Sequence, residues 1–79
     1  MFEEVRNLLV EELGINEEDI TPDSELVNDL GINSLDLADL IFQCESKYGI
    51  EISDEEITKF QTVGDVATTL AKMTGKDAD

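Results

Sequence analysis

The first stretch of the chain carries apolar residues at the three- and four-residue spacing that marks one face of a helix. These residues are Phe2, Val5, Leu8, Leu9 and Leu13. A half-buried strand would instead alternate apolar and polar residues. Glu3 and Glu4 suit the positive end of the helix dipole, and Gly14 is a natural end. The pattern therefore predicts an amphipathic helix from Phe2 to Leu13.

A long connection, 15–32, follows this helix and contains Pro22, the only proline. Asn16 can cap a short turn over residues 17–20. A connection of this length inside a compact domain needs apolar anchors to be ordered. The available anchors are Ile20, Leu26, Leu30 and Ile32. We therefore expect an ordered loop packed over the helices.

A second helix is expected to begin at Asn33 and to run to Tyr48, with Gly49 as its C-terminal cap. The side-chain oxygen of Asn33 can cap the helix amides, and Asp36 lies near the positive end. One face of this helix holds enough apolar residues for a core stripe, namely Leu37, Leu40, Ile41, Cys44 and Tyr48. We expect Cys44 to be a buried structural thiol.

Two further helices are predicted after a short extended segment, 50–52. Ser53 followed three residues later by Glu56 is a capping-box pattern, which opens a short helix that ends near Phe60. Thr62 offers a similar start for the last helix. The apolar stripe of that helix is Val63, Val66, Ala67, Leu70 and Met73. The four elements together predict an all-α fold, a small four-helix bundle with three main helices, one short helix and a long first loop.

The length of the chain, 79 residues, allows one domain. We place it at residues 1–74 and expect a frayed tail over residues 75–79. A chain this short buries only roughly 60% of its unfolded surface, so its core must be small. Because 41% of the residues are hydrophobic, the composition favours a folded domain over a disordered acidic tail.

The chain is strongly acidic, with 20 Asp and Glu against five Lys and Arg and a formal net charge of −15. Phosphate groups would repel such a surface, which argues against nucleic acid and against an anionic membrane as partners. Eleven of the acids lie between Glu11 and Glu45, an interval without a basic residue. Because this charge opposes folding through self-repulsion, we interpret it as a means of recognising basic partners.

The sequence also bears on location. No apolar run approaches the roughly 18 to 20 residues of a membrane span, so no membrane insertion is expected. The stretch Met1–Glu4 lacks the positive region and apolar segment of a secretory signal. Cys44 is the only cysteine, which excludes an internal disulfide and a cysteine-based zinc site. We expect a cytoplasmic monomer.

The residue inventory argues against a catalytic site and a dedicated metal site. There is no histidine, so the serines lack the base of a conventional triad. The five glycines are isolated and form no phosphate-binding loop. A calcium-loop spacing that starts at Asp29 fails, because Gly31 and Asn33 occupy its third and fifth positions. We therefore expect that the protein is not an enzyme.

A second apolar face, formed by Leu35, Ala38 and Phe42, lies on the Asn33–Tyr48 helix, well rotated from the core stripe. An amphipathic helix needs only one apolar face. The acids at the edge of this second face are Asp36, Asp39 and Glu45. Two interpretations stay open here, a docking surface for partners or a face that neighbouring loops or helices cover.

Ser34 stands beside this face, at the start of the helix. A serine in that place usually caps the helix, but Asn33 is the better cap, which frees the Ser34 hydroxyl to face solvent. A phosphate ester on this hydroxyl would lie at the positive end of the helix, where anions are stabilised. Ser34 can therefore carry a phosphodiester without electrostatic strain, despite the acidic surroundings.

The stretch Asp29-Leu-Gly followed by Ser34-Leu-Asp resembles the modification motif of acyl carrier proteins. The resemblance covers nearly the whole chain, because the helices and the long loop follow the family's order. It implies that Ser34 is the attachment point for 4'-phosphopantetheine, which a separate, magnesium-dependent phosphopantetheinyl transferase takes from coenzyme A.

The resemblance further implies a stand-alone carrier that holds acyl intermediates as thioesters on the thiol of this arm, for fatty acid or related lipid or secondary-metabolite biosynthesis. In the fatty-acid branch of the family the cargo is sheltered between the helices. The residues that correspond to the family's partner-recognition helix are Leu35, Asp36, Ala38, Asp39, Phe42 and Glu45. Acyl-chain synthesis or transfer enzymes with basic patches would be steered by the acids, while Leu35 and Phe42 supply apolar contact.

The chain departs from the family's pattern at Asn33, where the family usually has aspartate before the modified serine. That carboxylate is thought to help hold the transferase's magnesium. Asparagine keeps the cap and one oxygen but loses the charge, so we expect modification to survive, more slowly or by a different transferase. On the residues alone, two other hypotheses stay open, an unmodified acidic interaction module with the same fold and a divalent-ion buffer.

Overall fold

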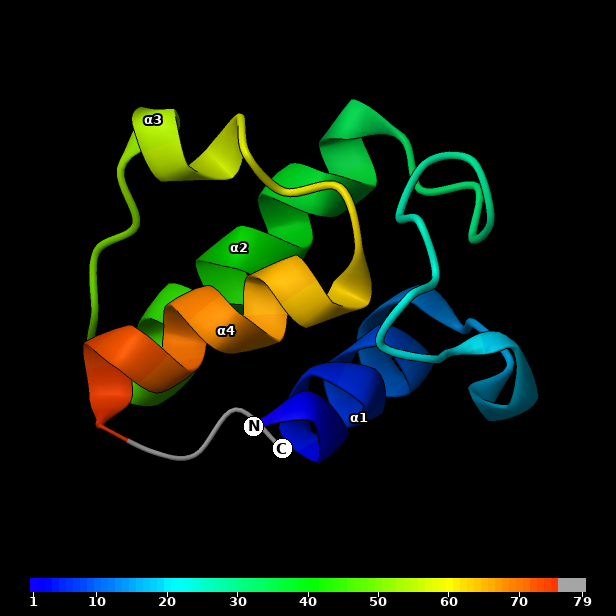
Figure 1. Cartoon of the computed structure of the whole chain (residues 1–79), viewed down its shortest axis with the longest axis horizontal. Coiled ribbons are helices and arrows are strands. Elements are labelled where there is room, and N and C mark those ends of the chain that lie inside the picture. Colours follow the sequence, from blue (N-terminus) through cyan, green and yellow to red (C-terminus); the bar gives the residue numbers. More distant parts are fainter. Residues whose placement is uncertain (76–79) are drawn as a thin grey trace.

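The chain forms four α-helices in the computed structural model, which describes residues 1–75 (Figure 1). They are α1 (Phe2–Leu13), α2 (Ser34–Tyr48), α3 (Asp54–Ile57) and α4 (Val63–Thr74), with a 3₁₀ turn, η1 (Glu17–Asp19), in the first loop. Within residues 1–75 there is no strand, only an isolated bridge between Glu25 and Thr62. The predicted all-α fold with four helices is confirmed.

The ends of the helices follow the capping residues that the sequence offers. Gly14 ends α1 and Gly49 ends α2 in the left-handed conformation, with φ of 68° and 64°. The side chain of Asn16 accepts a hydrogen bond from the first loop's short turn, as predicted. At the start of α4, Thr62 and Asp65 cap each other's backbone amides in a capping box. Local sequence therefore sets most of the helix boundaries.

The short helix α3 ends at Ile57, and the prediction that it reaches the neighbourhood of Phe60 is wrong. Ser53 caps it by accepting a hydrogen bond from the Glu56 amide at 3.3 Å. The chain then turns, and the Phe60 amide donates to the Ile57 carbonyl at 3.1 Å. This turn brings the Phe60 ring into the core, and burial of such a ring contributes more than one further helical hydrogen bond.

The apolar stripe of α4 is buried except at Met73, whose side chain is 37% exposed. Ala71, which is not part of the predicted stripe, is buried. The reason is that α4 packs chiefly on α1, whereas Met73 lines a hollow on the side of α3. Gly75 caps the end of α4 with φ of 76°, and residues 76–79 of the expected tail lie outside the described residues.

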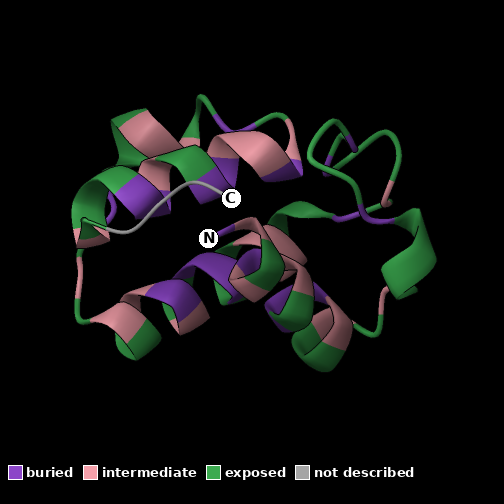
Figure 2. Cartoon of the chain, turned by 60° about the horizontal axis from the view of Figure 1, so that its bottom comes forward, coloured by how far each residue is buried: buried purple, intermediate pink, exposed green. Residues whose placement is uncertain are grey.

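The core lies where α1 packs against both α4 and α2. Figure 2 shows the buried positions on the facing sides of these helices and at separate points of the first loop. Three predicted anchors of that loop, Ile20, Leu26 and Ile32, are buried, and Leu30 packs against the core while partly exposed. The loop is therefore ordered by apolar contacts along its length.

Backbone hydrogen bonds also fix the first loop to the start of α4. The Val63 amide donates to the Ser24 carbonyl at 3.0 Å, and the Gly64 amide donates to the Pro22 carbonyl at 2.8 Å. A Cβ added at Gly64 would lie 2.8 Å from the Pro22 carbonyl oxygen, so only glycine permits this approach. The first loop, which leads to α2, is thus held in place by the start of α4, a segment distant in the sequence.

Candidate functional site

The start of α2 presents Ser34 to solvent. The side-chain oxygen of Asn33 accepts a hydrogen bond from the Asp36 amide at 2.8 Å, and the Asn33 carbonyl accepts one from the Leu37 amide at 2.9 Å. Asn33 is therefore the cap, as predicted. Ser34, the first residue of the helix, is exposed and is not required for capping. Its hydroxyl lies at the positive end of the α2 dipole.

The second apolar face of α2 is open. Leu35 is 82% exposed and Phe42 is 61% exposed, and Ala38 between them is also exposed. The loops and helices within residues 1–75 leave this face uncovered, so the interpretation that they cover it is wrong, and a docking surface stays a prediction. An exposed leucine and an exposed phenylalanine on one helix are a feature of interaction surfaces.

The three acids at the edge of this face differ in their exposure and in their hydrogen bonds. Asp39 is exposed and Asp36 is partly buried. Glu45 is partly buried, and its Oε2 accepts a hydrogen bond from the Ile52 amide at 2.8 Å. This bond ties α2 to the connection before α3, so Glu45 has a structural role beside any role in recognition.

The opposite face of α2 enters the core. Leu40, Ile41 and Cys44 are buried, while Leu37 and Tyr48 pack against the core partly exposed. Burial raises the pKa of the Cys44 thiol to about 11, so at neutral pH the thiol keeps its proton and is a poor nucleophile. Burial, together with a hydrogen bond to Glu4, raises the pKa of Tyr48 well above its usual value. Cys44 is thus a structural residue, as predicted.

An apolar hollow of about 310 Å³ lies directly beside Ser34. Its walls come from α2 and from one residue of α3, and they are Ser34, Leu37, Ala38, Ile41 and Ile57. Sequence reasoning did not place Ile57 at the site. The available signal was that Ile57 is the one apolar residue of α3, which must turn its single hydrophobic side chain toward the bundle.

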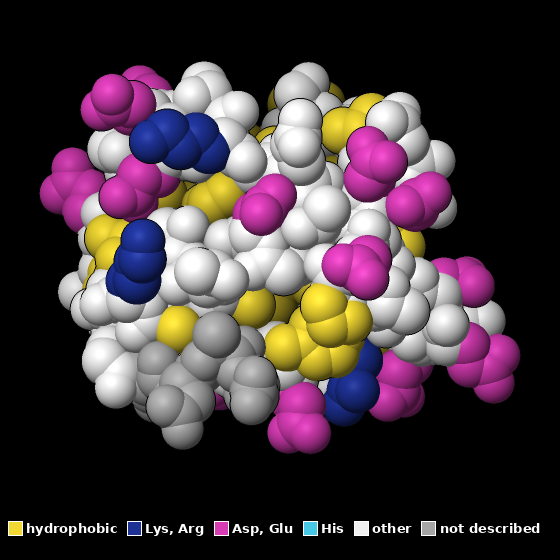
Figure 3. Space-filling model, in the orientation of Figure 1, with side chains coloured by type: hydrophobic (Ala, Val, Ile, Leu, Met, Phe, Trp, Pro, Cys, Tyr) yellow, Lys and Arg dark blue, Asp and Glu magenta, His cyan; other side chains and the backbone are white. Residues whose placement is uncertain are grey.

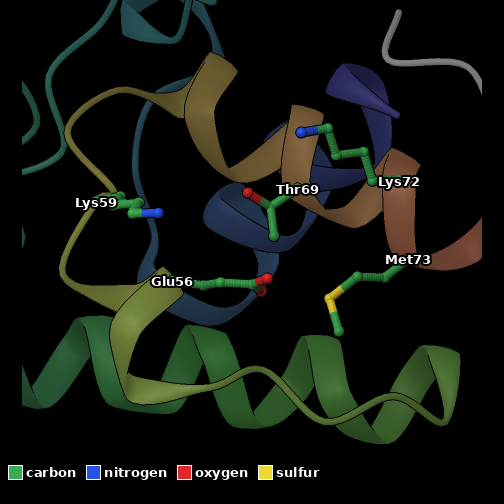
Figure 4. A pocket seen from close by; sticks show the side chains of 5 residues that line it. All are labelled: Glu56, Lys59, Thr69, Lys72 and Met73. Carbon is green, nitrogen blue, oxygen red and sulfur yellow. The ribbon is translucent and has the colours of Figure 1, made fainter.

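A second, smaller hollow of about 150 Å³ lies between α3 and α4 and has both charged and apolar side chains in its lining. Figure 4 shows the Glu56 carboxylate reaching from α3 toward α4 and ending near Thr69 and Met73, with Lys59 and Lys72 on either side. The Oε2 atom of Glu56 is buried and has no hydrogen-bond partner among the described residues. This charged lining distinguishes the second hollow from the apolar one at Ser34.

The electrostatics of the surface are dominated by acids. In the face shown in Figure 3, acidic side chains are spread over the surface and Lys or Arg side chains are few. Within residues 1–75, no group of three or more acidic, cysteine or histidine side chains is placed to hold a metal ion. No helix in that same range is long and apolar enough to cross a membrane.

Comparison with known proteins agrees with this geometry. Residues 3–70 match the family described as "Phosphopantetheine attachment site". The chain belongs to this family, whose members are carriers rather than enzymes and whose domain is the site of covalent 4'-phosphopantetheine attachment in acyl carrier proteins. The chain is also similar to an acyl carrier protein of Thermotoga maritima, with 37% identity over 75 residues, or 95% of this chain and 93% of the relative. Acyl carrier proteins interact with phosphopantetheinyl transferases and with acyl-handling enzymes.

Proposed function

We propose that this chain is an acyl carrier protein whose Ser34 carries 4'-phosphopantetheine through a phosphodiester. The observation that supports this most directly is the division of roles at the start of α2, where Asn33 caps the helix and Ser34 is exposed. The arm, when attached, supplies a thiol that holds an acyl group as a thioester. The residues of the protein position the arm at the positive end of a helix, where a phosphodiester anion is stabilised.

The apolar hollow beside Ser34 favours an acyl cargo with a hydrocarbon chain, in fatty acid or related lipid metabolism. Leu37, Ala38, Ile41 and Ile57 offer no charged group to a polar or aminoacyl cargo. Binding of the hydrocarbon part of the cargo in the hollow would be favoured by roughly 0.8 kcal/mol for each methylene group fully removed from water.

The open face of α2 is the proposed surface for partner enzymes. Leu35, Ala38 and Phe42 offer apolar contact, and Asp36, Asp39 and Glu45 offer charge to a basic patch on the partner. The net charge of −15 would speed the approach of basic partners and would keep copies of this chain apart as monomers. The same charge makes association depend on ionic strength.

The proposal is tested by loading the purified chain. The chain is incubated with coenzyme A, magnesium and a broad-specificity phosphopantetheinyl transferase, and its intact mass is followed, with Ser34→Ala and Ser46→Ala as variants. Ser46 is a second exposed serine of α2, which makes it a matched control. We expect wild type and Ser46→Ala to gain one phosphopantetheine and Ser34→Ala to gain none. No gain by wild type, under conditions in which a known carrier is loaded, would support the unmodified interaction module instead.

A further inference from the structure

Val27 is an exposed apolar side chain on the loop that leads to Ser34. It is 63% exposed, whereas the preceding residue, Leu26, is buried and 1% exposed. Single exposed apolar residues are common on protein surfaces and need no explanation by themselves. The significance of Val27 therefore depends on how rigidly it is held and on how close it lies to the modified position.

The turn that contains Val27 is closed by backbone hydrogen bonds. The Gly31 amide donates to the Val27 carbonyl at 3.1 Å, and the Ile32 amide donates to the Leu26 carbonyl at 2.9 Å. Gly31 has φ of 67°, the left-handed conformation that closes such a turn. The Leu26 amide in turn donates to the Gln61 carbonyl at 2.8 Å, which fixes the turn to the segment before α4. Val27 is thus held outward on a rigid support.

The distance from Val27 to Ser34 is limited by the chain itself. Gly31 and Ser34 are three residues apart, which spans at most about 11 Å, and the Gly31 amide is bonded to Val27. The Val27 carbonyl therefore lies within about 14 Å of the Ser34 backbone. A standard protein interface buries about 800 Å² on each partner, which corresponds to a disc of about 16 Å radius. Val27 therefore lies within reach of an interface of ordinary size centred on Ser34.

We infer that Val27 is a contact residue for the phosphopantetheinyl transferase, an inference that rests on the proposed function of Ser34. The transferase is the partner that must bring its own active site to the Ser34 hydroxyl, whereas enzymes that act on the cargo meet the end of an arm. Glu25 and Asp29, exposed acids of the same turn, surround Val27 with charge that complements a basic surface. A β-branched valine has few rotamers and loses little entropy when a partner buries it.

The test measures the rate of arm transfer from coenzyme A by intact mass, over a range of carrier concentrations. Val27→Ser should lower kcat/KM about fivefold or more, the effect of losing an interface contact worth about 1 kcal/mol, and should do so through KM. Val27→Ile should keep nearly the wild-type rate, because it keeps the apolar contact. Met73→Ser, at an exposed apolar residue of α4, is the control and should also leave the rate unchanged. All variants are assayed below their melting temperatures, which circular dichroism supplies.

Two results would overturn the inference about Val27, and only the second would also overturn the proposed function of Ser34. If wild type is loaded and Val27→Ser is loaded with the same KM, the contact assigned to Val27 is wrong while the function of Ser34 stands. If wild type takes no arm, the proposed function is wrong and the contact assigned to Val27 is wrong with it.

Discussion

The side-chain oxygen of Asn33 accepts a hydrogen bond from the backbone amide of Asp36 at 2.8 Å, and this bond determines what the start of α2 offers to a partner. The amide group of asparagine has one oxygen, and here that oxygen already accepts the capping hydrogen bond and has one lone pair left. The remaining polar atom is a nitrogen, which donates hydrogen bonds and cannot ligate a cation. An aspartate in the same position would cap with one oxygen and keep the second oxygen free.

Two substitutions of Asn33 separate these roles. Asn33→Ala removes the cap and should lower the free energy of unfolding by about 1 kcal/mol, measured by urea denaturation. Asn33→Asp keeps the cap and supplies the carboxylate that the family usually has there, so it should leave stability within about 0.5 kcal/mol of wild type and speed arm transfer. An Asn33→Asp variant that is loaded no faster than wild type would show that the missing charge does not limit modification.

Gly64→Ala tests the contact that holds the first loop. The added Cβ would lie 2.8 Å from the Pro22 carbonyl oxygen, which is backbone and cannot rotate away. We expect a loss of about 1 to 3 kcal/mol in the free energy of unfolding, even though alanine favours helices. Thr68→Ala, at an exposed position of the same helix, is the control and should be neutral or slightly stabilising. Equal stabilities of the two variants would mean that the loop can shift at little cost.

Glu56 should be a destabilising residue, because its Oε2 is buried without a hydrogen-bond partner among the described residues. Glu56→Gln keeps the shape of the side chain and removes its charge, and because an unsatisfied buried atom costs more in a charged group, it should raise the free energy of unfolding by about 1 kcal/mol relative to its control. The control is Glu55→Gln, which removes one charge from an exposed neighbour in α3 and so accounts for general self-repulsion. If the two variants are equally stable, Lys59 or Lys72 already compensates the Glu56 charge in solution.

Phe42 and Phe60 provide a matched pair of variants that tests the docking face, which is the open face of α2 formed by Leu35, Ala38 and Phe42. Phe42→Ala should change the free energy of unfolding by no more than about 0.5 kcal/mol, because the ring is 61% exposed, and should raise the KM for arm transfer. Phe60→Ala should cost about 3 to 5 kcal/mol, because that ring is 9% exposed and fills the core. A loss of several kcal/mol on truncating Phe42 would place its ring in the core and remove it from the docking face.

The parts of this structure that depend on local chemistry could be predicted from the sequence. The cap at Asn33, the left-handed ends at Gly14 and Gly49 and the box at Thr62 each depend on residues within one helical turn. The two faces of α2 follow from helical period alone.

The parts that depend on distant neighbours could not be predicted in the same way. Periodicity located the face of Leu35 and Phe42 but could not decide whether another element covers it. The end of α3 depends on the core accepting the Phe60 ring, and the exposure of Met73 depends on α4 packing toward α1. The role of Ile57 as a wall of the hollow requires α3 to lie beside α2, which no spacing within α3 indicates.

The most direct test of the account is to locate the arm on protein isolated from cells that contain an active phosphopantetheinyl transferase. The chain has no Lys or Arg between Arg6 and Lys47, so trypsin releases Ser34 and the whole docking face in a single peptide, residues 7–47. Fragmentation of this peptide should place one phosphopantetheine on Ser34. An arm on another residue, or a folded chain that remains unmodified while a second carrier in the same cells is loaded, would contradict the account.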